Sequence, residues 1–351
     1  MSSACREPEM HIAMVLASRG QGGLEKHVCE LSAALVARGH RVSLLLDPCL
    51  LSAVPVGVEA VAIDMRRHRY HPRLWWQLRQ QLLQLQPDIV HAQANKATCL
   101  LAAIRHWLPM PCVATLHNLK NHIRAYLRMD QVIAVSRYLA GLMAPFPAAV
   151  IYHGIVPPIP SPALPPREGF TWLAVGRLVP AKGFDLLLDA IDGLPLTLWI
   201  AGSGPEDAQL KQRAQQLSAP TRVVFLGQVA DVPALMQQSD GLVISSRREG
   251  FSYVCAEALL CRLPVLATDV PIANEVLPPA WVVPVGDVQA LRQRMQVAMQ
   301  APATWRSELA PAFEIAQQQL TVARMVAQTE AVYAAAMQPG ALRHDPAPTD
   351  Y

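Results

Sequence analysis

The sequence predicts an α/β protein built from two doubly wound domains, each with a parallel sheet. Short apolar segments alternate with amphipathic helical stretches along almost all of the 351 residues. The apolar segments are continuous runs, as expected for strands that helices cover on both faces. A proline-rich stretch, residues 156–166, interrupts the alternation because proline continues neither a helix nor a central strand.

The expected strands form two sets, one on each side of the proline-rich stretch. In the first half they are residues 11–17, 41–46, 89–92, 112–116, 132–135 and 150–152. In the second half they are residues 172–175, 196–201, 223–226, 241–245, 264–267 and 281–283. We therefore expect a first domain at 1–163, a second at 164–318, a helix at 319–338 that packs back towards the first domain, and a loose tail at 339–351.

Composition narrows the class of protein. A hydrophobic content of 52% with 16% charged residues describes a packed globular chain. No apolar run reaches the roughly 18 residues of a membrane-spanning helix, and the early run 12–17 is too short for a signal peptide. The seven cysteines form no C-x-x-C pair, which indicates a reducing compartment without a disulfide framework or zinc site. We expect a cytoplasmic protein.

Charge is distributed unevenly. Residues 1–163 hold 16 Lys and Arg against 9 Asp and Glu, a balance of +7, and the remainder has −4. Residues 66–86 are basic and aromatic, and three interpretations stay open for them. They could bind the anionic inner face of the cytoplasmic membrane, or bind an anionic acceptor. They could also form a helix that packs in the core and has a solvated basic edge. No nucleic-acid-binding module is visible.

Two carboxylates follow a predicted strand of the second domain. Glu249 and Glu257 stand eight positions apart, and Gly250, Phe251 and Ser252 form a turn before the helical run around the second. Backbone N–H groups at a helix start bind phosphates, and carboxylates accept hydrogen bonds from sugar and ribose hydroxyls. This pattern favours a site for a sugar nucleotide.

A glycine-flanked basic loop follows the first strand of the same domain. Arg177 offers a planar donor fork and Lys182 a point charge, which together suit a diphosphate, although a solvated basic loop would look the same. Both motifs follow strands, and ligands in open α/β sheets bind outside the carboxyl ends of strands.

The first domain offers a second glycine loop and several histidines. Gly22 and Gly23 open a helix, but Glu25 stands where a dinucleotide fingerprint requires glycine, which argues against a dehydrogenase. His91 and His117 end predicted strands, and His153 lies at the domain junction. Each of these histidines could be a structural residue or a residue of the site. D-x-D, H-E-x-x-H, G-x-S-x-G and P-loop motifs are absent, so a metal-dependent mechanism has no support in the sequence.

In this order the motifs resemble the GT-B glycosyltransferases of family 4, which are retaining, nucleotide-sugar-dependent enzymes. The resemblance rests on Gly22-Gly23-x-Glu25, residues 38–42, 88–91, 115–117, 135–136 and 153–154, Gly176-Arg177 with Lys182-Gly183, residues 201–205 and 225–227, and the E-x7-E segment. It implies two Rossmann-like domains facing a cleft, the first on the acceptor side and the second binding the nucleotide sugar.

The resemblance also implies roles for single residues. Glu249 would contact the transferred sugar and Glu257 the ribose, while Arg177 and Lys182 would hold the diphosphate. His117 would lie near the donor sugar. Glu249, His117, Arg177 and Lys182 would be the catalytic group. The other substrate-binding residues would be Gly22, Gly23, Gly227, Gly250, Phe251, Ser252 and Glu257.

Two positions depart from the family pattern. Arg262 stands where glycine is common, and residues 271–274, beginning with Pro271, replace a Gly-Gly pair whose amides meet the donor sugar. These departures keep open a non-catalytic GT-B binding or scaffold protein. A nucleotide-sugar epimerase on the same architecture is a further alternative to a glycosyltransferase.

The expected reaction moves a hexose from a nucleoside-diphosphate sugar to a saccharide or lipid-linked acceptor. A UDP-sugar is favoured over a GDP-sugar, and no metal is expected. The acceptor would belong to a cell-envelope glycan such as lipopolysaccharide core.

Overall fold

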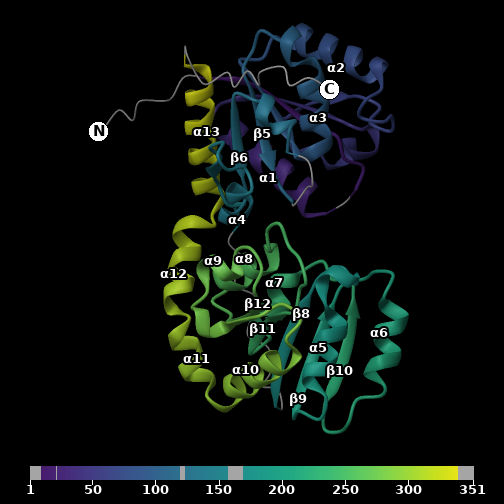
Figure 1. Cartoon of the computed structure of the whole chain (residues 1–351), viewed down its shortest axis with the longest axis vertical. Coiled ribbons are helices and arrows are strands. Elements are labelled where there is room, and N and C mark those ends of the chain that lie inside the picture. The colour runs from purple at the N-terminus through teal and green to yellow at the C-terminus, as the bar shows by residue number, and fades with distance from the viewer. Residues whose placement is uncertain (1–8, 21, 119–122, 157–168, 339–351) are drawn as a thin grey trace. The chain divides into compact units, whose positions relative to one another are not determined.

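The computed structural model describes residues 9–20, 22–118, 123–156 and 169–338 (Figure 1). The backbone divides into two compact units. Unit 1 comprises Met1–Gly154 with Val322–Tyr351, and unit 2 comprises Ile155–Thr321. The boundary expected at residues 163 and 164, and the tail expected at 339–351, lie outside the described residues.

Unit 1 contains a seven-stranded parallel sheet in the order β3-β2-β1-β4-β5-β6-β7. Its strands are β1 His11–Leu16, β2 Arg41–Leu46, β3 Glu59–Ala62, β4 Ile89–Gln93, β5 Cys112–Leu116, β6 Gln131–Ala134 and β7 Ala149–Val150. Its helices are α1 Gly23–Ala37, α2 Pro72–Leu85, α3 Ala94–Ile104, α4 Arg137–Gly141 and α13 Val322–Met337. Short 3-10 helices are η1 Pro48–Ala53, η2 Arg105–Trp107 and η3 Tyr126–Arg128.

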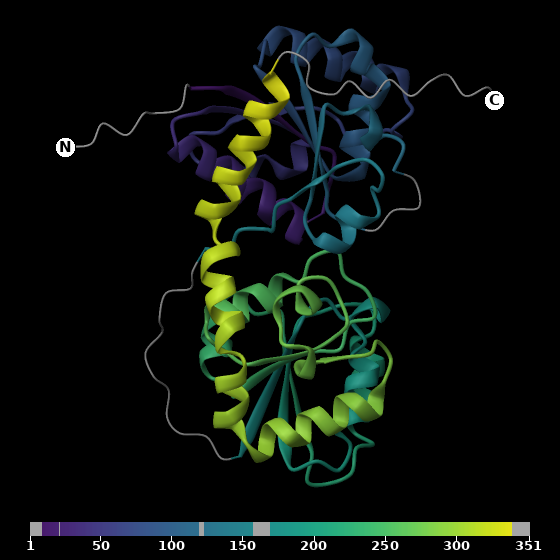
Figure 2. The same cartoon turned by 60° about the vertical axis from the view of Figure 1, so that its left-hand side comes forward.

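Helices cover both faces of this sheet. Right-handed crossovers place α1 on one face and α2 and α3 on the other, because the chain moves in opposite directions along the sheet in the two cases. The last helix, α13, packs against α1 and the ends of β5 and β6 (Figure 2). Its buried Tyr333 joins the core formed by Met14, Leu35 and Leu44.

Unit 2 contains a six-stranded parallel sheet in the order β10-β9-β8-β11-β12-β13. Its strands are β8 Phe170–Val175, β9 Leu196–Ala201, β10 Arg222–Gly227, β11 Gly241–Ile244, β12 Val265–Thr268 and β13 Val282–Val283. Its helices are α5 Phe184–Ile191, α6 Asp207–Ala214, α7 Val232–Gln237, α8 Tyr253–Leu260, α9 Ala273–Val276, α10 Val288–Gln300, α11 Pro302–Glu308 and α12 Ala310–Gln319. Its 3-10 helices are η4 Pro180–Lys182 and η5 Pro279–Trp281.

The predicted fold class is confirmed, and the structure adds one strand that the sequence did not predict. Strand β3 lies at the edge of the sheet, and its residues are exposed or half-buried. An edge strand in contact with water does not need the continuous apolar run that marks central strands. Pattern reasoning therefore missed it.

The basic, aromatic segment 66–86 forms helix α2 and the loop before it. Leu74, Leu78 and Leu82 recur at helical spacing and are buried, so this face packs in the core of unit 1. Trp76 points outward and is 62% exposed. Among the helices of the described residues, none is both long and apolar enough to cross a bilayer.

Candidate functional site

The residues singled out in the sequence gather at the carboxyl ends of strands, where the strand order of each sheet reverses. In unit 2 the reversal lies between β8 and β11, and the loops after these strands carry Lys182 and Glu249. In unit 1 it lies between β1 and β4, and the loop after β1 carries Gly22. Such switch points are where ligands bind in doubly wound sheets.

A partly buried ion pair joins the two loops of unit 2. Lys182 Nζ donates a hydrogen bond to Glu249 Oε1 at 2.5 Å, and Ser246 Oγ donates to the same oxygen at 2.8 Å. The Glu249 side chain is 9% exposed and that of Lys182 27%. The predicted diphosphate cation and the predicted sugar carboxylate therefore contact each other directly.

A second ion pair holds the same loops from the outside. The Arg247 guanidinium donates to both carboxylate oxygens of Asp185, at 2.7 and 2.6 Å, and this contact lowers the pKa of Asp185. Arg247 also donates from its backbone to the Ala181 carbonyl at 2.8 Å. The sequence did not predict this ion pair, because the two residues lie 62 positions apart and no local pattern links them.

Glycines in these loops are required by close backbone contacts. Gly183 has φ +65°, and a Cβ there would collide with the Ser245 carbonyl oxygen. Gly202 has φ +147°, and its Cβ would collide with the carbonyl of Gly176. The two glycines let the loops after β8, β9 and β11 pack backbone to backbone, which brings Lys182 to Glu249.

The other predicted donor residues lie around this pair in unit 2. Arg177 is exposed and forms no ion pair with a described residue. Glu257 is half-buried on α8. Gly227 ends β10 in a left-handed conformation, φ +66°, and its carbonyl accepts a hydrogen bond from the Gly202 amide at 2.7 Å.

The turn before α8 contains an unsatisfied polar group. Gly250 and Phe251 are buried, and Ser252 is the N-cap residue of α8. The Ser252 hydroxyl is buried and makes no hydrogen bond to a described residue. A buried hydroxyl without a partner at a helix N-terminus is suited to an anionic ligand, because the helix amides there also point outward.

The two departures from the family pattern keep a backbone conformation that suits glycine. Arg262 has φ +55° and Ile272 has φ +74°, and Ile272 is fully buried. Positive φ in a β-branched residue is strained, by about 1–3 kcal/mol. Both positions therefore have a positive φ that glycine adopts without strain, and Pro271 contributes no N–H group.

The glycine loop of unit 1 is capped by its own carboxylate. Gly22 is the N-cap residue of α1 and Gly23 its first residue. Glu25 accepts a hydrogen bond from the Gly22 amide at 2.8 Å and another from the Ser18 hydroxyl. The start of α1 therefore already holds a negative charge.

His117 belongs to a buried chain of hydrogen-bonded side chains in unit 1. Its Nε2 lies 2.7 Å from Gln93 Oε1, and its Nδ1 lies 3.4 Å from His153 Nε2. His153 Nδ1 lies 2.6 Å from His27 Nδ1. Burial lowers the pKa of His27 to about 3 and holds the pKa of His117 and of His153 well below 6.5, so all three rings are neutral.

Neutrality fixes which nitrogen carries each proton. A neutral imidazole has one donor and one acceptor nitrogen, so His117 donates from Nε2 to Gln93 and accepts at Nδ1 from His153. His153 then accepts at Nδ1 from His27, whose Nε2 is left as an acceptor without a hydrogen bond to a described residue. Both nitrogens of His117 are therefore used within unit 1.

The same three histidines are a candidate metal cluster that sequence reasoning missed, because His27 stands far from the other two in the chain. One ring nitrogen of each lies within 4.8 Å of the others. The 2.6 Å between His153 and His27 is, however, shorter than the roughly 3.3 Å between ligand atoms around a tetrahedral zinc with Zn–N bonds of about 2.0–2.1 Å. Hydrogen-bonded imidazoles account for this spacing better than a metal site.

Comparisons with known proteins find glycosyltransferase relatives for both halves of the chain. A model described as glycosyl transferases group 1 matches residues 159–311, and one described as glycosyltransferase family 4 matches residues 21–157. The chain is 25% identical to the lipopolysaccharide core biosynthesis glycosyltransferase LpsD of Rhizobium meliloti, over 75% of this chain and 78% of that protein. It is 30% identical to an uncharacterized glycosyltransferase of Methanocaldococcus jannaschii, over 54% of this chain and 58% of that protein, which is less than two thirds of its length.

A solved structure supports the fold. Anabaena HepE, crystallised in complex with UDP and glucose, superposes with a TM-score of 0.78 at 22% identity, over 93% of this chain and 100% of that chain. At this identity the likeness concerns the fold. Together the two family models match most of the sequence, one on each side of the proline-rich stretch. The chain therefore belongs to the family 4 glycosyltransferases and has their GT-B fold.

Proposed function

We propose that this protein is a retaining, metal-independent hexosyltransferase that uses a nucleoside-diphosphate sugar. Unit 2 would bind the donor, and unit 1 would bind the acceptor. The observation that carries the proposal is the contact between Lys182 and Glu249 at the switch point of unit 2. A cation for the diphosphate and a carboxylate for the sugar are present there, in the order along the chain that family 4 enzymes share.

The surroundings of the pair fit a donor of this kind. Arg177 is exposed in the loop that leads to Lys182, where it can reach an anion in solvent. The unsatisfied Ser252 hydroxyl and the start of α8 offer donors for a phosphate oxygen. Glu257 would accept hydrogen bonds from the ribose hydroxyls. A bound diphosphate would take over the ammonium of Lys182 and leave Glu249 to accept hydrogen bonds from sugar hydroxyls.

The reaction would proceed on one face of the sugar. The bond between the anomeric carbon and the phosphate oxygen breaks, and a bond from that carbon to the acceptor oxygen forms on the same side. The acceptor proton passes to a phosphate oxygen of the leaving nucleotide, so no protein nucleophile is needed. Arg177 and Lys182 would stabilise the negative charge that develops on the diphosphate.

The related proteins support the substrate classes of the proposal. HepE was crystallised with UDP and glucose, which favours a uridine nucleotide and a hexose here. LpsD acts in lipopolysaccharide core biosynthesis, which favours a cell-envelope glycan as the acceptor. The net charge of +7 in residues 1–163 fits an acceptor that carries negative charge.

A non-catalytic binding protein is the second candidate, and one observation favours it. Pro271 cannot supply the amide that the family offers to the donor sugar. Against this stands Ile272, which keeps a strained positive φ of +74° that glycine would adopt more easily. Strain of this kind persists where function requires it, so the catalytic proposal is preferred.

Calorimetric titration with UDP and GDP, each in the presence of EDTA, tests the donor assignment. We expect UDP to bind more tightly than GDP, and Glu257→Ala to weaken UDP binding by about 10-fold or more, since a hydrogen bond to a charged group is lost. Glu314→Ala, a change at an exposed carboxylate of the same unit, should leave the affinity unchanged. Full UDP affinity in Glu257→Ala would refute the ribose assignment.

A further inference from the structure

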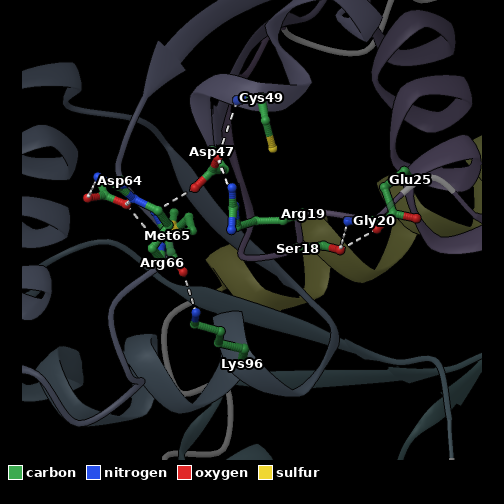
Figure 3. A network of polar contacts seen from close by, with 10 residues as sticks. All are labelled: Ser18, Arg19, Gly20, Glu25, Asp47, Cys49, Asp64, Met65, Arg66 and Lys96. Carbon is green, nitrogen blue, oxygen red and sulfur yellow. Dashed lines mark hydrogen bonds and ion pairs between the residues drawn. The ribbon is translucent and has the colours of Figure 1, made fainter.

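A network of charged side chains lies at the carboxyl edge of the unit 1 sheet (Figure 3). Arg19 follows β1, Asp47 follows β2 directly, and Lys96 lies in the first turn of α3 after β4. These three strands are neighbours, in the order β2-β1-β4. The network therefore occupies the edge where a doubly wound unit binds its ligand.

Asp47 is the buried anchor of this network. Its carboxylate accepts hydrogen bonds from the Met65 amide at 2.9 Å and from the Cys49 amide at 3.2 Å. It also accepts one from Arg19 Nε at 3.3 Å. The Asp47 side chain is 5% exposed and that of Arg19 53%, so the carboxylate holds the guanidinium by one edge and leaves most of it in solvent.

Within the part of the chain that the structure describes, Lys96 and Arg69 form no ion pair with a carboxylate. Lys96 Nζ donates to the Met65 carbonyl, and among the described residues it forms no ion pair. The Arg69 guanidinium lies 5.7 Å from the centre of the Tyr70 ring, and its Nη1 makes a weak contact with Cys99 Sγ at 3.8 Å. The nearby Asp64 is occupied by Arg66, through two hydrogen bonds of 2.9 Å.

The charges of Arg19 and Arg69 act on Lys96. Partial burial is the largest cause that lowers the pKa of Lys96, and the charges of Arg19 and Arg69 lower it further against the opposing effect of Asp47. Lys96 also stands in the first turn of a helix, where the helix dipole favours an acid over a base. Ala94, which starts this helix, has a left-handed φ of +65°. The partial burial of Lys96, its place in the first turn of α3 and the positive φ of Ala94 each reduce stability, as is common at binding sites.

We propose that Arg19, Arg69 and Lys96 form a subsite for a phosphoryl group on the saccharide acceptor. The proposal rests on the proposed function, since it concerns the acceptor of the same reaction. A phosphate bound at this edge would supply negative charge to Lys96 and Arg69, which have no carboxylate partner among the described residues, and would accept hydrogen bonds from the exposed side of Arg19. Asp47 would keep Arg19 in place for this contact.

Binding of glucose 6-phosphate, glucuronate and glucose, followed by NMR in the absence of nucleotide, tests the subsite. We expect glucose 6-phosphate to bind more tightly than glucose, with glucuronate between them if a single negative charge suffices. Lys96→Met and Arg69→Gln should each weaken the phosphosugar by about 10-fold and leave glucose unchanged, because each removes one charge-assisted hydrogen bond. Lys96→Arg, which keeps the charge, should retain most of the affinity.

The control is Arg222→Gln, which removes one charge from an exposed position at the start of β10 in unit 2. Equal loss of glucose 6-phosphate binding in this variant, or no preference of the wild type for the phosphosugar over glucose, would overturn the subsite. UDP titration of the same samples separates the two proposals. UDP binding without phosphosugar preference rejects only the subsite, and the reverse result rejects only the donor site.

Discussion

Lys182 and Glu249, 67 positions apart in the chain, form an ion pair in which Nζ lies 2.5 Å from Oε1. The pair occupies the place where the diphosphate and the sugar of a donor are proposed to bind. A donor bound there would therefore replace the existing contact between Lys182 and Glu249. Because the Glu249 side chain is only 9% exposed, removal of the lysine alone leaves a carboxylate that is mostly shielded from water.

Lys182→Met should weaken UDP binding by 10- to 100-fold, because a charge-assisted contact to the diphosphate is worth about 1.5–3 kcal/mol. Turnover should fall at least as much, since the ammonium also stabilises the leaving group. Calorimetry and a nucleotide-release assay measure the two effects. Lys211→Met removes the same charge from an exposed pair with Asp207 and serves as the control. Equal UDP affinity in Lys182→Met and Lys211→Met would contradict the assignment.

Arg262→Gly should be more stable than Arg262→Ala by about 1 kcal/mol, because a left-handed backbone costs about 1–2 kcal/mol in any residue with a Cβ. Both variants lose the Arg262 contacts with Glu314 and Phe313, so their difference reports the backbone alone. Urea unfolding measures it. A glycine variant that is less stable than the alanine variant would show that φ +55° is not strained at this position.

The tautomers of the histidine chain can be read directly. Two-bond ¹H–¹⁵N correlation spectra should show His117 and His153 protonated at Nε2 and His27 protonated at Nδ1, as the hydrogen bonds require. Addition of Zn²⁺ should not change these signals, since the histidines are spaced as hydrogen-bond partners. A zinc-induced shift of all three rings at stoichiometric metal would instead identify a metal site.

Stability should fall on acidification through His91. Its ring is buried between Tyr333 and Thr115, each 2.7 Å from one ring nitrogen, and burial lowers its pKa from 6.5 to about 3. The unfolded state then binds one more proton between these values, so this contribution is complete above pH 6.5 and is lost towards pH 3. From pH 7 to pH 5 the loss is about 2 kcal/mol for this one group.

Urea unfolding at both pH values checks this sign and size. His91→Gln should lose about 2 kcal/mol less than the wild type between pH 7 and pH 5, since glutamine takes up no proton there. His68→Gln, at an exposed position of the same unit, should keep the wild-type dependence. An identical fall in His91→Gln and wild type would mean that His91 does not titrate as described.

Much of the fold followed from the sequence, for identifiable reasons. Central parallel strands are apolar along their whole length, so β1, β4 and β9 stand out, whereas the edge strand β3 carries no such run. The sequence did not predict contacts between side chains that are far apart in the chain, such as Arg247 with Asp185 or His27 with His153. These contacts depend on which loops the sheets bring together, and the local spacing of residues in the sequence does not predict this.

At Arg262 and Ile272 the sequence did not reveal the backbone conformation. The sequence predicted that a missing glycine could alter the sugar pocket. The backbone at both positions nevertheless has a positive φ, which glycine adopts without strain. Packing of the fully buried Ile272 side chain offsets the strain, and such an effect follows from tertiary structure alone.

Incubation with UDP-glucose and a phosphorylated envelope saccharide in EDTA, followed by NMR of the product anomeric proton and carbon, tests most directly whether the chain transfers a hexose with retention and without metal. We expect UDP release together with a product of the same α configuration as the donor, and loss of both in Lys182→Met. A β-linked product, or activity that disappears in EDTA and returns with a divalent cation, would contradict this expectation.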